Sequence, residues 1–463
     1  METIKLSAVK PADYNPRKIS DEGFENLKTS LKTLGVIKPI LVNADNHVLI
    51  AGHQRTRAMQ EVGITECMAF ILHGVKHHDE CRFNQFHNLC EYEVSKDAPV
   101  IKITQPLEYG INIIEPKNMK VINAGNFASL NKQLAELVSK FGEFGLPISD
   151  KSGNIEISSA YALACRNVGI KMHCLVMPDE KIELAKYYLS KDYGEFCYDG
   201  LERHTYMQAL AQMFRLPSEG KCKKSRLYKE LVLPFLSKLG NKQLRMLDFG
   251  AGRYDYAKML QSRGYNIHAL DPYHRENGAD LSVGLNTRAF LKVCSDLDTH
   301  GQYDVVVCDS VLNSIDNIQS WYDVIFTCSA LLKMGGCLFI SGRKRAETTS
   351  QKRGRKTAAR KNYGVYFLDR DGLSANYRSG TWFFQKFDDE SQVKLIENLI
   401  GAKVERYANA ETYGLHLQKT KELPLEKVLP SIMREWDMPL PQGRSYGLQE
   451  QIKQSITRVY NGL

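Results

Sequence analysis

The spacing of hydrophobic positions changes several times along the chain, and each spacing predicts a different element. In residues 20–34 the apolar side chains recur every three or four positions behind Ser20, a residue type that caps helix N-termini, so we expect an amphipathic helix. Residues 36–50 carry two β-rich runs separated by a turn-forming stretch, which predicts a pair of strands. A second helix is expected to follow Gly52 and to end at Gly63.

From residue 225 the pattern becomes one of alternating strands and helices. Apolar strands are expected at 246–247 and 266–270, with a glycine-rich turn and a helix between them, and further apolar runs follow within 303–316 and 331–342. Such alternation favours a parallel sheet wound with helices. The fold class expected for the whole chain is therefore multidomain α/β.

Composition narrows the class of protein. A length of 463 residues predicts two to four domains, and 43% hydrophobic with 25% charged residues is typical of folded proteins. The chain has no run of eighteen apolar residues, its start has no apolar signal core, and its eleven cysteines have no framework spacing, so we expect a cytoplasmic protein with reduced thiols and no membrane partner. The histidines and cysteines within 77–91 lack the paired short gaps of structural zinc sites, so no metal site is expected there.

The turn after the first strand pair, Gly52-His53-Gln54-Arg55, has the composition of an anion site. A glycine corner that opens a helix presents free backbone N–H groups and the positive end of the helix dipole. Arg55 and Arg57 add guanidinium groups, which grip phosphate in a forked geometry. On spacing alone, an alternative is that both arginines are solvated helix residues and His53 is a turn residue.

Several features in order give this region a family resemblance. Asn15-Pro16-Arg17, Gly35-x-Ile37-x-Pro39-Ile40, Gly52-x-x-Arg55-x-Arg57-Ala58 and Gly63 resemble the ParB/sulfiredoxin-like N-terminal domain, over about residues 1–95. In that family the corner binds nucleotide phosphates, CTP in partitioning members and ATP in sulfiredoxin and related kinases. His53-Gln54 departs from the acidic–arginine pair usual in CTP-binding members, so CTP or ATP, with Mg²⁺, both stay open. Sulfiredoxin chemistry needs a cysteine that this corner lacks. The resemblance implies these nucleotide-binding residues: Arg17, Gly52, His53, Arg55 and Arg57.

The pattern of the first domain returns 106 residues later. Residues 130–148 and 151–170 read like the earlier helix, strand pair and second helix, with Gly169 at the position of Gly63. We interpret residues 96–205 as a degenerate copy that binds no nucleotide, because every phosphate-gripping residue is replaced. A chance recurrence of the element order is the alternative. At this offset the corner residues become Ser158, Ser159, Tyr161 and Leu163.

The second glycine turn, Gly250-Ala251-Gly252, lies about twenty residues before Asp271, which ends the next strand. Glycines allow close backbone approach to a ligand, and a carboxylate at that distance accepts hydrogen bonds from ribose hydroxyls. A Rossmann dinucleotide enzyme is the competing interpretation, but Arg253 follows the turn and the third glycine of that fingerprint is missing.

The segments MLDFGAG, NIHALD, YDVVVCDSVLNSID and LLKMGGCLFISG, in this order, resemble a class I S-adenosylmethionine-dependent methyltransferase with a Rossmann-like sheet, over about 240–345. The resemblance implies that Gly250 and Gly252 border the methionine part of the cofactor, that Asp248 lies beneath it and that Asp271 holds the ribose. It makes Asp309, at the end of the fourth strand, the candidate catalytic residue, facing the cofactor amine or the substrate.

The acceptor is not fixed by this resemblance. Residues 308–312 lack the Asp/Asn-Pro-Pro-aromatic motif of adenine and cytosine amino-methyltransferases, and Cys308 lacks the preceding proline of cytosine carbon-5 enzymes. The Ser-Val-Leu-Asn-Ser loop looks more like that of small-molecule or oxygen and carbon methyltransferases, including those linked to DNA-modification gene clusters.

A basic insertion follows the fifth predicted strand. Nine of the nineteen residues in 343–361 are Lys or Arg, and the chain as a whole has a net charge of +9, which fits an anionic partner. Such a segment attracts a phosphate backbone independently of sequence, and a merely solvated loop is the alternative. The candidate nucleic-acid-binding residues are Arg343, Lys344, Arg345, Lys352, Arg353, Arg355, Lys356, Arg360 and Lys361.

These features define a domain plan and a working hypothesis. The plan is a ParB-like domain at 1–95, its degenerate copy at 96–205, a helical linker at 206–239, a methyltransferase-like domain at 240–420 and a helical tail at 421–463. We expect a methyltransferase that acts on DNA or a modified DNA component, with a nucleotide- or DNA-binding front domain, from a phage or mobile-element modification system. The alternatives are a nucleotide-gated partition-type protein with an inactive methyltransferase fold, and a ParB-like kinase coupled to a small-molecule methyltransferase. The oligomeric state stays open.

Overall fold

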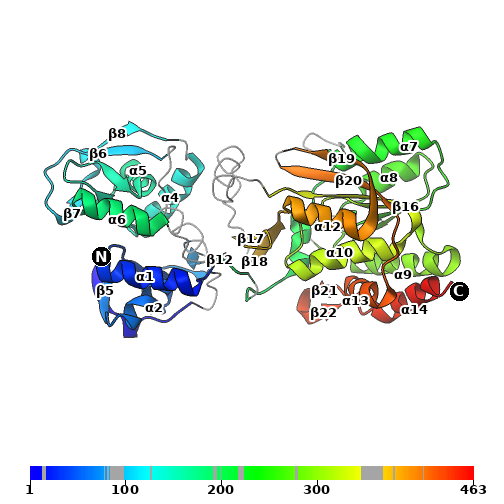
Figure 1. Cartoon of the computed structure of the whole chain (residues 1–463), viewed down its shortest axis with the longest axis horizontal. Coiled ribbons are helices and arrows are strands. Elements are labelled where there is room, and N and C mark those ends of the chain that lie inside the picture. Colours follow the sequence, from blue (N-terminus) through cyan, green and yellow to red (C-terminus); the bar gives the residue numbers. More distant parts are fainter. Residues whose placement is uncertain are drawn as a thin grey trace. The chain divides into compact units, whose positions relative to one another are not determined.

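The computed structural model describes two compact units of the chain (Figure 1). The first unit contains Met1–Leu201, and the second contains Glu202–Glu347 and Asp371–Leu463. Among the helices of the described residues, none combines the length and apolar character that a bilayer-spanning segment needs. The described residues are 1–12, 17–77, 79–80, 83, 98–125, 128–190, 195–198, 200–216, 224–276, 280–345, 369–378, 381–409 and 411–462.

The first half of the first unit is a four-stranded sheet in the order β1-β5-β3-β4. β3 is parallel to β5, and the β1–β5 and β3–β4 pairs are antiparallel. The helix predicted at 20–34 is confirmed: Ser20 Oγ accepts from the Gly23 N–H at 3.1 Å and caps it, and Gly35, with φ +71°, ends it. The elements are β1 (Glu2–Lys5), η1 (Leu6–Ala8), β2 (Arg17–Lys18), α1 (Asp21–Leu34), β3 (Ile40–Asn43), β4 (Leu49–Ala51), α2 (His53–Glu61) and β5 (Glu66–Leu72).

The second half repeats this topology. Its sheet has the order β10-β9-β11-β7, with β9 parallel to β11 and the outer pairs antiparallel, as in the first half. β10 and α5 begin 106 residues after β4 and α2, and Ser158 has a φ of +63° at the position of Gly52. This matching topology supports a degenerate copy, which stays a prediction. The elements are β6 (Val100–Ile103), β7 (Gly110–Ile114), η2 (Pro116–Asn118), β8 (Met119–Asn123), α4 (Ala128–Phe141), β9 (Ile148–Ser149), β10 (Ile155–Ile157), α5 (Ser159–Val168), β11 (Met172–Val176), α6 (Asp179–Ser190) and β12 (Glu195–Phe196).

The two halves of the first unit share one hydrophobic core. A single cluster contains buried side chains of the first sheet, such as Ile50 and Phe70, together with Leu137 and Tyr161 of the second half. The burial of these apolar side chains in one continuous cluster holds the two halves of the first unit together.

The second unit is built on a six-stranded sheet in the order β14-β13-β15-β16-β20-β19. The first four strands of this order are parallel to one another, and β20 is antiparallel to both of its neighbours. The carboxyl ends of β13, β14 and β15 therefore meet at one edge of the sheet. The strands are β13 (Met246–Phe249), β14 (Ile267–Leu270), β15 (Tyr303–Cys308), β16 (Leu332–Arg343), β19 (Gly401–Ala408) and β20 (Thr412–Lys419).

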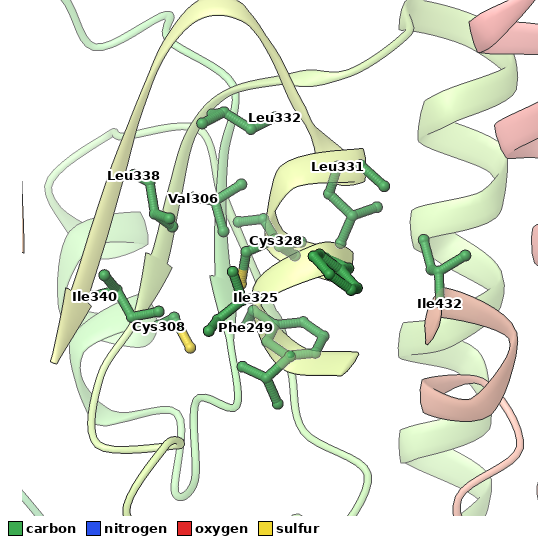
Figure 2. Packing of buried hydrophobic residues seen from close by; sticks show 14 of the residues in the cluster. Phe249, Val306, Cys308, Ile325, Cys328, Leu331, Leu332, Leu338, Ile340 and Ile432 are labelled. Atoms are coloured by element: carbon green, nitrogen blue, oxygen red, sulfur yellow. The ribbon is translucent and has the colours of Figure 1, made fainter. Parts of the chain in front are cut away.

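Two hydrophobic clusters pack this sheet. One joins η4, α7 and α8 to the sheet through residues such as Tyr228 and Leu260, and the other joins it to α9, α10, α12, α13 and α14. Figure 2 shows part of the second cluster, where Phe249 and Cys308 of the strands lie close to Ile325 and Cys328 of α10. The helices are η3 (Thr205–Ala211), η4 (Tyr228–Val232), α7 (Leu233–Leu239), α8 (Asp255–Ser262), α9 (Val283–His300), α10 (Ile318–Leu331), α12 (Glu390–Ile400), α13 (Leu425–Glu435), η5 (Pro441–Gly443) and α14 (Gln449–Tyr460).

The C-terminal segment, for which the sequence did not decide between capping the domain and packing on a partner, belongs to this unit. Its helices α13 and α14 contribute buried Val428, Ile432 and Ile452 to the second cluster. Arg434 Nη2 also lies 2.6 Å from Asp323 Oδ1 of α10, an ion pair that fixes α13 against α10. The remaining strands form two hairpins, β17 (Leu373–Arg378) with β18 (Thr381–Lys386) and β21 (Pro439–Leu440) with β22 (Arg444–Ser445).

Candidate functional site

The glycine turn after β13 lies against the end of β14. The N–H groups of Gly250 and Ala251 both donate to the Leu270 carbonyl, at 2.7 and 3.1 Å. Gly250 has a φ of +72°, and an added Cβ would lie 2.2 Å from Val311 Cγ2, so only glycine fits there. Gly252 has a φ of +57°, but an added Cβ would meet no atom of the described residues within 4 Å. The space beside Gly250 is therefore filled by Val311, whereas the space beside Gly252 is open.

Asp271 lies beside this turn, as the sequence predicts. Its Oδ2 accepts from the Gly252 N–H at 2.8 Å, and its Oδ1 accepts from the Tyr273 N–H at 2.7 Å and from Gln212 Nε2 at 3.1 Å. Burial raises the pKa of Asp271 to about 6, and these hydrogen bonds oppose the rise. The side chain is thus oriented as a buried acceptor at the carboxyl edge.

Two more carboxyl groups lie at the same edge. Asp248 is the third residue of β13 and is buried, and this burial raises its pKa to about 7; the hydroxyl of Tyr228 opposes the rise. Asp309 follows β15, and its Oδ1 accepts from Ser341 Oγ at 2.8 Å and from Ser310 Oγ at 3.2 Å. Ser310 has a φ of +64°, a strained conformation for a residue other than glycine. The structure therefore places all the predicted cofactor and catalytic residues at one edge.

Several residues at this edge were not predicted from the sequence. His274 lies with its Nδ1 2.7 Å from the Gly252 carbonyl, and its ring stacks on Tyr254 at 3.8 Å between centroids. Tyr228 lies in the single turn of π-helix that precedes α7, a feature frequent at functional sites. Gln212 comes from the predicted linker. Each of these residues lies far in the sequence from its partner at the site, so no short sequence motif identifies it.

The corner of the first unit has the predicted backbone. Gly52 is the N-cap of α2 with a φ of +98°, and an added Cβ would lie 2.8 Å from Ile40 Cγ2. His53 Nε2 accepts from the Ala12 N–H at 3.2 Å. Burial lowers the pKa of His53 to about 4, and its hydrogen bond to the Leu49 backbone opposes this. His53 is therefore neutral and holds backbone segments together.

The two arginines of this corner differ in their surroundings. Arg55 Nη1 donates to the Lys38 carbonyl at 2.7 Å and lies 3.5 Å from the Pro39 carbonyl. The Arg57 guanidinium lies 3.9 Å from the centroid of the Phe24 ring and is half exposed. Arg17 lies in β2, which pairs with β12. Arg55 is thus turned toward the loop before β3, whereas Arg57 lies against α1.

Only the start of the basic insertion lies within the described residues. Arg343 ends β16, and its Nη1 donates to Gln385 Oε1 at 3.2 Å. The Lys344 N–H donates to the Glu411 carbonyl and the Arg345 N–H to the Asp388 carbonyl. These residues are anchored to the sheet edge. The other predicted nucleic-acid-binding residues lie outside the described residues: Lys352, Arg353, Arg355, Lys356, Arg360 and Lys361.

Models of two known protein families match the two regions of the chain that contain these sites. Residues 1–89 match the model of the ParB N-terminal domain, and residues 222–374 match the model of a methyltransferase domain. The chain carries a ParB N-terminal domain and a methyltransferase domain. Both resemblances identified in the sequence are confirmed, together with the mixed α/β fold.

The matched relatives of the ParB domain are partitioning proteins. The chain is 39% identical over 71 residues to the probable chromosome-partitioning protein ParB of Campylobacter jejuni, a match that covers 15% of this chain and 26% of that protein. The corresponding protein of Neisseria meningitidis is 37% identical over 75 residues, with the same shares covered. The chain thus spans about a quarter of the length of the curated relatives that it matches.

Solved methyltransferase structures show only low similarity. The 1,6-didemethyltoxoflavin-N1-methyltransferase of Burkholderia thailandensis has 15% identity and a TM-score of 0.28, covering 42% of this chain and 80% of that one. The N-methyltransferase NodS of Bradyrhizobium japonicum has 12% identity and a TM-score of 0.28, covering 47% of this chain and 100% of that one.

Proposed function

We propose that this protein is an S-adenosylmethionine-dependent methyltransferase that acts on DNA or on a modified DNA component, and that its ParB domain binds a nucleotide. The observation that carries the proposal is the 2.8 Å hydrogen bond between the Gly252 N–H and Asp271 Oδ2 within the methyltransferase domain. It joins a glycine turn to an acidic strand end, the combination that an adenosine-type ligand requires.

The residues present fit such a cofactor. Gly252 leaves open space beside the turn, Asp271 is a buried acceptor at the neighbouring strand end, and Gln212 next to it carries a buried oxygen with no hydrogen-bond partner among the described residues. Orphaned polar atoms of this kind are expected where a ligand supplies the missing partner. When bound, S-adenosylmethionine supplies an electrophilic methyl group.

The other residues at this edge of the sheet are proposed to act on the methyl acceptor or to shape the site around it. Asp309 lies at the carboxyl end of β15, where two hydroxyl groups orient its carboxylate. We assign it the role of the general base that removes the proton of the acceptor group. Asp248 lies beneath the turn and, with a pKa of about 7, is only partly ionised at neutral pH. The strained Ser310 fixes the direction in which the strand end turns.

DNA is the proposed acceptor class for two reasons. The ParB domain is similar to part of a probable chromosome-partitioning protein, and nine basic residues lie within 343–361, a stretch that begins at the last residue of β16. Lysine and arginine in such numbers favour a polyphosphate backbone, through contacts that weaken with salt.

The front domain is proposed to bind CTP or ATP with Mg²⁺. Gly52 opens the nine-residue helix α2 in a left-handed conformation, so the positive end of the helix dipole lies at this corner. Arg55 lies at the same corner and places a guanidinium, the group that grips phosphate in a forked geometry, next to the Lys38 carbonyl.

The methyltransferase proposal is tested by incubating the full chain with methyl-labelled S-adenosylmethionine and pools of DNA, RNA and small molecules. Label in DNA or in a nucleotide component supports the proposal. Label confined to RNA or to an unrelated small molecule overturns the acceptor class, and a chain that binds no S-adenosylmethionine in calorimetry overturns the enzyme.

The nucleotide proposal is tested with Arg55→Ala and with Arg57→Ala, the other arginine predicted at this corner. We expect Arg55→Ala to weaken CTP or ATP binding by about tenfold or more, the value of one charged hydrogen bond. Arg57→Ala, which removes a half-exposed side chain that stacks on Phe24, is expected to have the smaller effect. Equal and unchanged binding in both variants would reject Arg55 as a phosphate contact.

A further inference from the structure

A segment that precedes the methyltransferase sheet crosses its carboxyl edge. We call residues 204–216 the strap. Thr205 Oγ1 donates to Asp316 Oδ2, and Gln208 Nε2 donates to the Phe384 carbonyl at 3.2 Å. Further along, the Arg215 N–H donates to Asp255 Oδ2 at 2.5 Å. The strap is therefore anchored near both of its ends to the second unit.

Gln212 lies between these anchors and reaches Asp271. Its Nε2 is 3.1 Å from Asp271 Oδ1. A carboxylate only accepts hydrogen bonds, so the amide nitrogen must face it and the amide oxygen must point away. That oxygen, Oε1, is buried and has no hydrogen-bond partner among the described residues. A buried acceptor left without a donor is unfavourable, so this position favours a bound group that supplies the donor missing from the described residues.

The geometry points to Gln212 as a further cofactor-binding residue, whose Oε1 accepts a hydrogen bond from a ribose hydroxyl next to Asp271. This inference rests on the proposed function, since it requires S-adenosylmethionine at the turn. A ribose presents two neighbouring hydroxyl groups, and Asp271 with Gln212 presents two neighbouring acceptors. The Asp271–Gln212 contact sets their spacing, and the strap anchors hold Gln212 in place.

The test measures binding of S-adenosylhomocysteine and of its 2′-deoxy and 3′-deoxy analogues to the full chain by calorimetry. Gln212→Met keeps the length of the side chain and removes the acceptor, and Gln212→Ala removes the whole side chain. Met213→Ala is the matched control, because Met213 is the next residue of the strap and its side chain is half exposed.

Loss of one neutral hydrogen bond predicts binding that is about threefold to tenfold weaker in both Gln212 variants, and about wild-type binding in Met213→Ala. Removing one ribose hydroxyl should weaken binding to the wild type but have a smaller effect on Gln212→Met, because the two changes delete the same contact. This non-additivity separates a direct contact from a general loosening of the strap.

Two results overturn the inference, and they differ in scope. If the wild-type chain binds no S-adenosylhomocysteine, the proposed function falls together with this inference. If the wild type binds it while both Gln212 variants bind equally well, or if each deoxy analogue loses as much affinity on Gln212→Met as on the wild type, only the role of Gln212 is rejected.

Discussion

Lys38 Nζ donates to Ser158 Oγ at 2.9 Å, although the two residues are 120 positions apart in the chain. The same nitrogen donates to the Leu146 carbonyl at 3.1 Å, and the Lys38 side chain is only 3% exposed. Ser158 occupies the corner of the second half that corresponds to Gly52 in the first. A cation of the first half therefore lies at the corner of the second half that begins with Ser158.

This contact predicts a loss of stability in the first unit when Lys38 is replaced. Lys38→Ala leaves the buried Ser158 hydroxyl and Leu146 carbonyl without this donor, which is expected to cost about 1–3 kcal/mol. Hydrogen exchange of the amides in β9 and α5 is the appropriate measurement, because it reports on one part of a multidomain chain. Lys32→Ala, at an exposed position of α1, is the control. Unchanged protection in Lys38→Ala would show that the contact does not stabilise the interface.

The glycine turn of the methyltransferase domain predicts a sharp difference between two similar substitutions. Gly250→Ala places a Cβ 2.2 Å from Val311 Cγ2 in a left-handed conformation, so it must displace Val311 or distort the turn. Gly252→Ala has the same conformational strain, of about 1 kcal/mol, but no clash. We expect Gly250→Ala to lower the melting temperature of the second unit more than Gly252→Ala does. Equal melting temperatures would mean that the loop of Val311 moves away freely.

A buried carboxyl group predicts a pH dependence of stability. Burial raises the pKa of Glu435, at the end of α13, to about 8, the carboxylates of Asp323 and Asp316 reinforce the rise and Arg434 opposes it. The folded state therefore favours the protonated acid. The Glu435 side chain makes its full contribution to stability below the unfolded pKa of 4.5, and this contribution is lost as the pH rises through about 8.

We therefore expect the free energy of unfolding of the second unit to fall between about pH 4.5 and pH 8, and Glu435→Gln to reduce this fall because its amide stays neutral. Urea unfolding followed by the fluorescence of Trp321 and Trp436, both buried in this unit, measures it. Glu426→Gln, at an exposed position of the same helix, should keep the wild-type pH profile. A Glu435→Gln profile parallel to that of the wild type would contradict the assignment.

The local elements could be read from the sequence because their signals lie within a few residues of one another. The Ser20 cap and the apolar spacing behind it define α1, and the distance from Gly252 to Asp271 is set by one helix and one strand. The start of β10 also lies 106 residues after the start of β4, which is the offset seen in the sequence.

Contacts between distant segments could not be read in this way. Gln212 and Asp271 are 59 positions apart, and no spacing rule relates a residue of a linker to a strand end. The direction of Arg55 was also beyond the sequence, because it depends on how the loop of Lys38 and Pro39 lies against α2. Tertiary packing determines where these side chains lie, and a single sequence gives the identity of the residues but not which of them come into contact.

Asp309 provides a last prediction, which separates chemistry from binding. Ser341 Oγ and Ser310 Oγ both donate to its Oδ1, so the carboxylate is held in one orientation at the end of β15. If it takes the proton of the acceptor, Asp309→Asn should lower the rate of methyl transfer by about 10²–10⁴-fold, because an amide is not a base, while S-adenosylhomocysteine binds about as in the wild type. Ser341→Ala, which removes one orienting hydroxyl, should lower the rate less. An Asp309→Asn variant that transfers methyl groups at the wild-type rate would show that proton removal does not depend on Asp309; one that loses cofactor binding would place Asp309 against the cofactor instead.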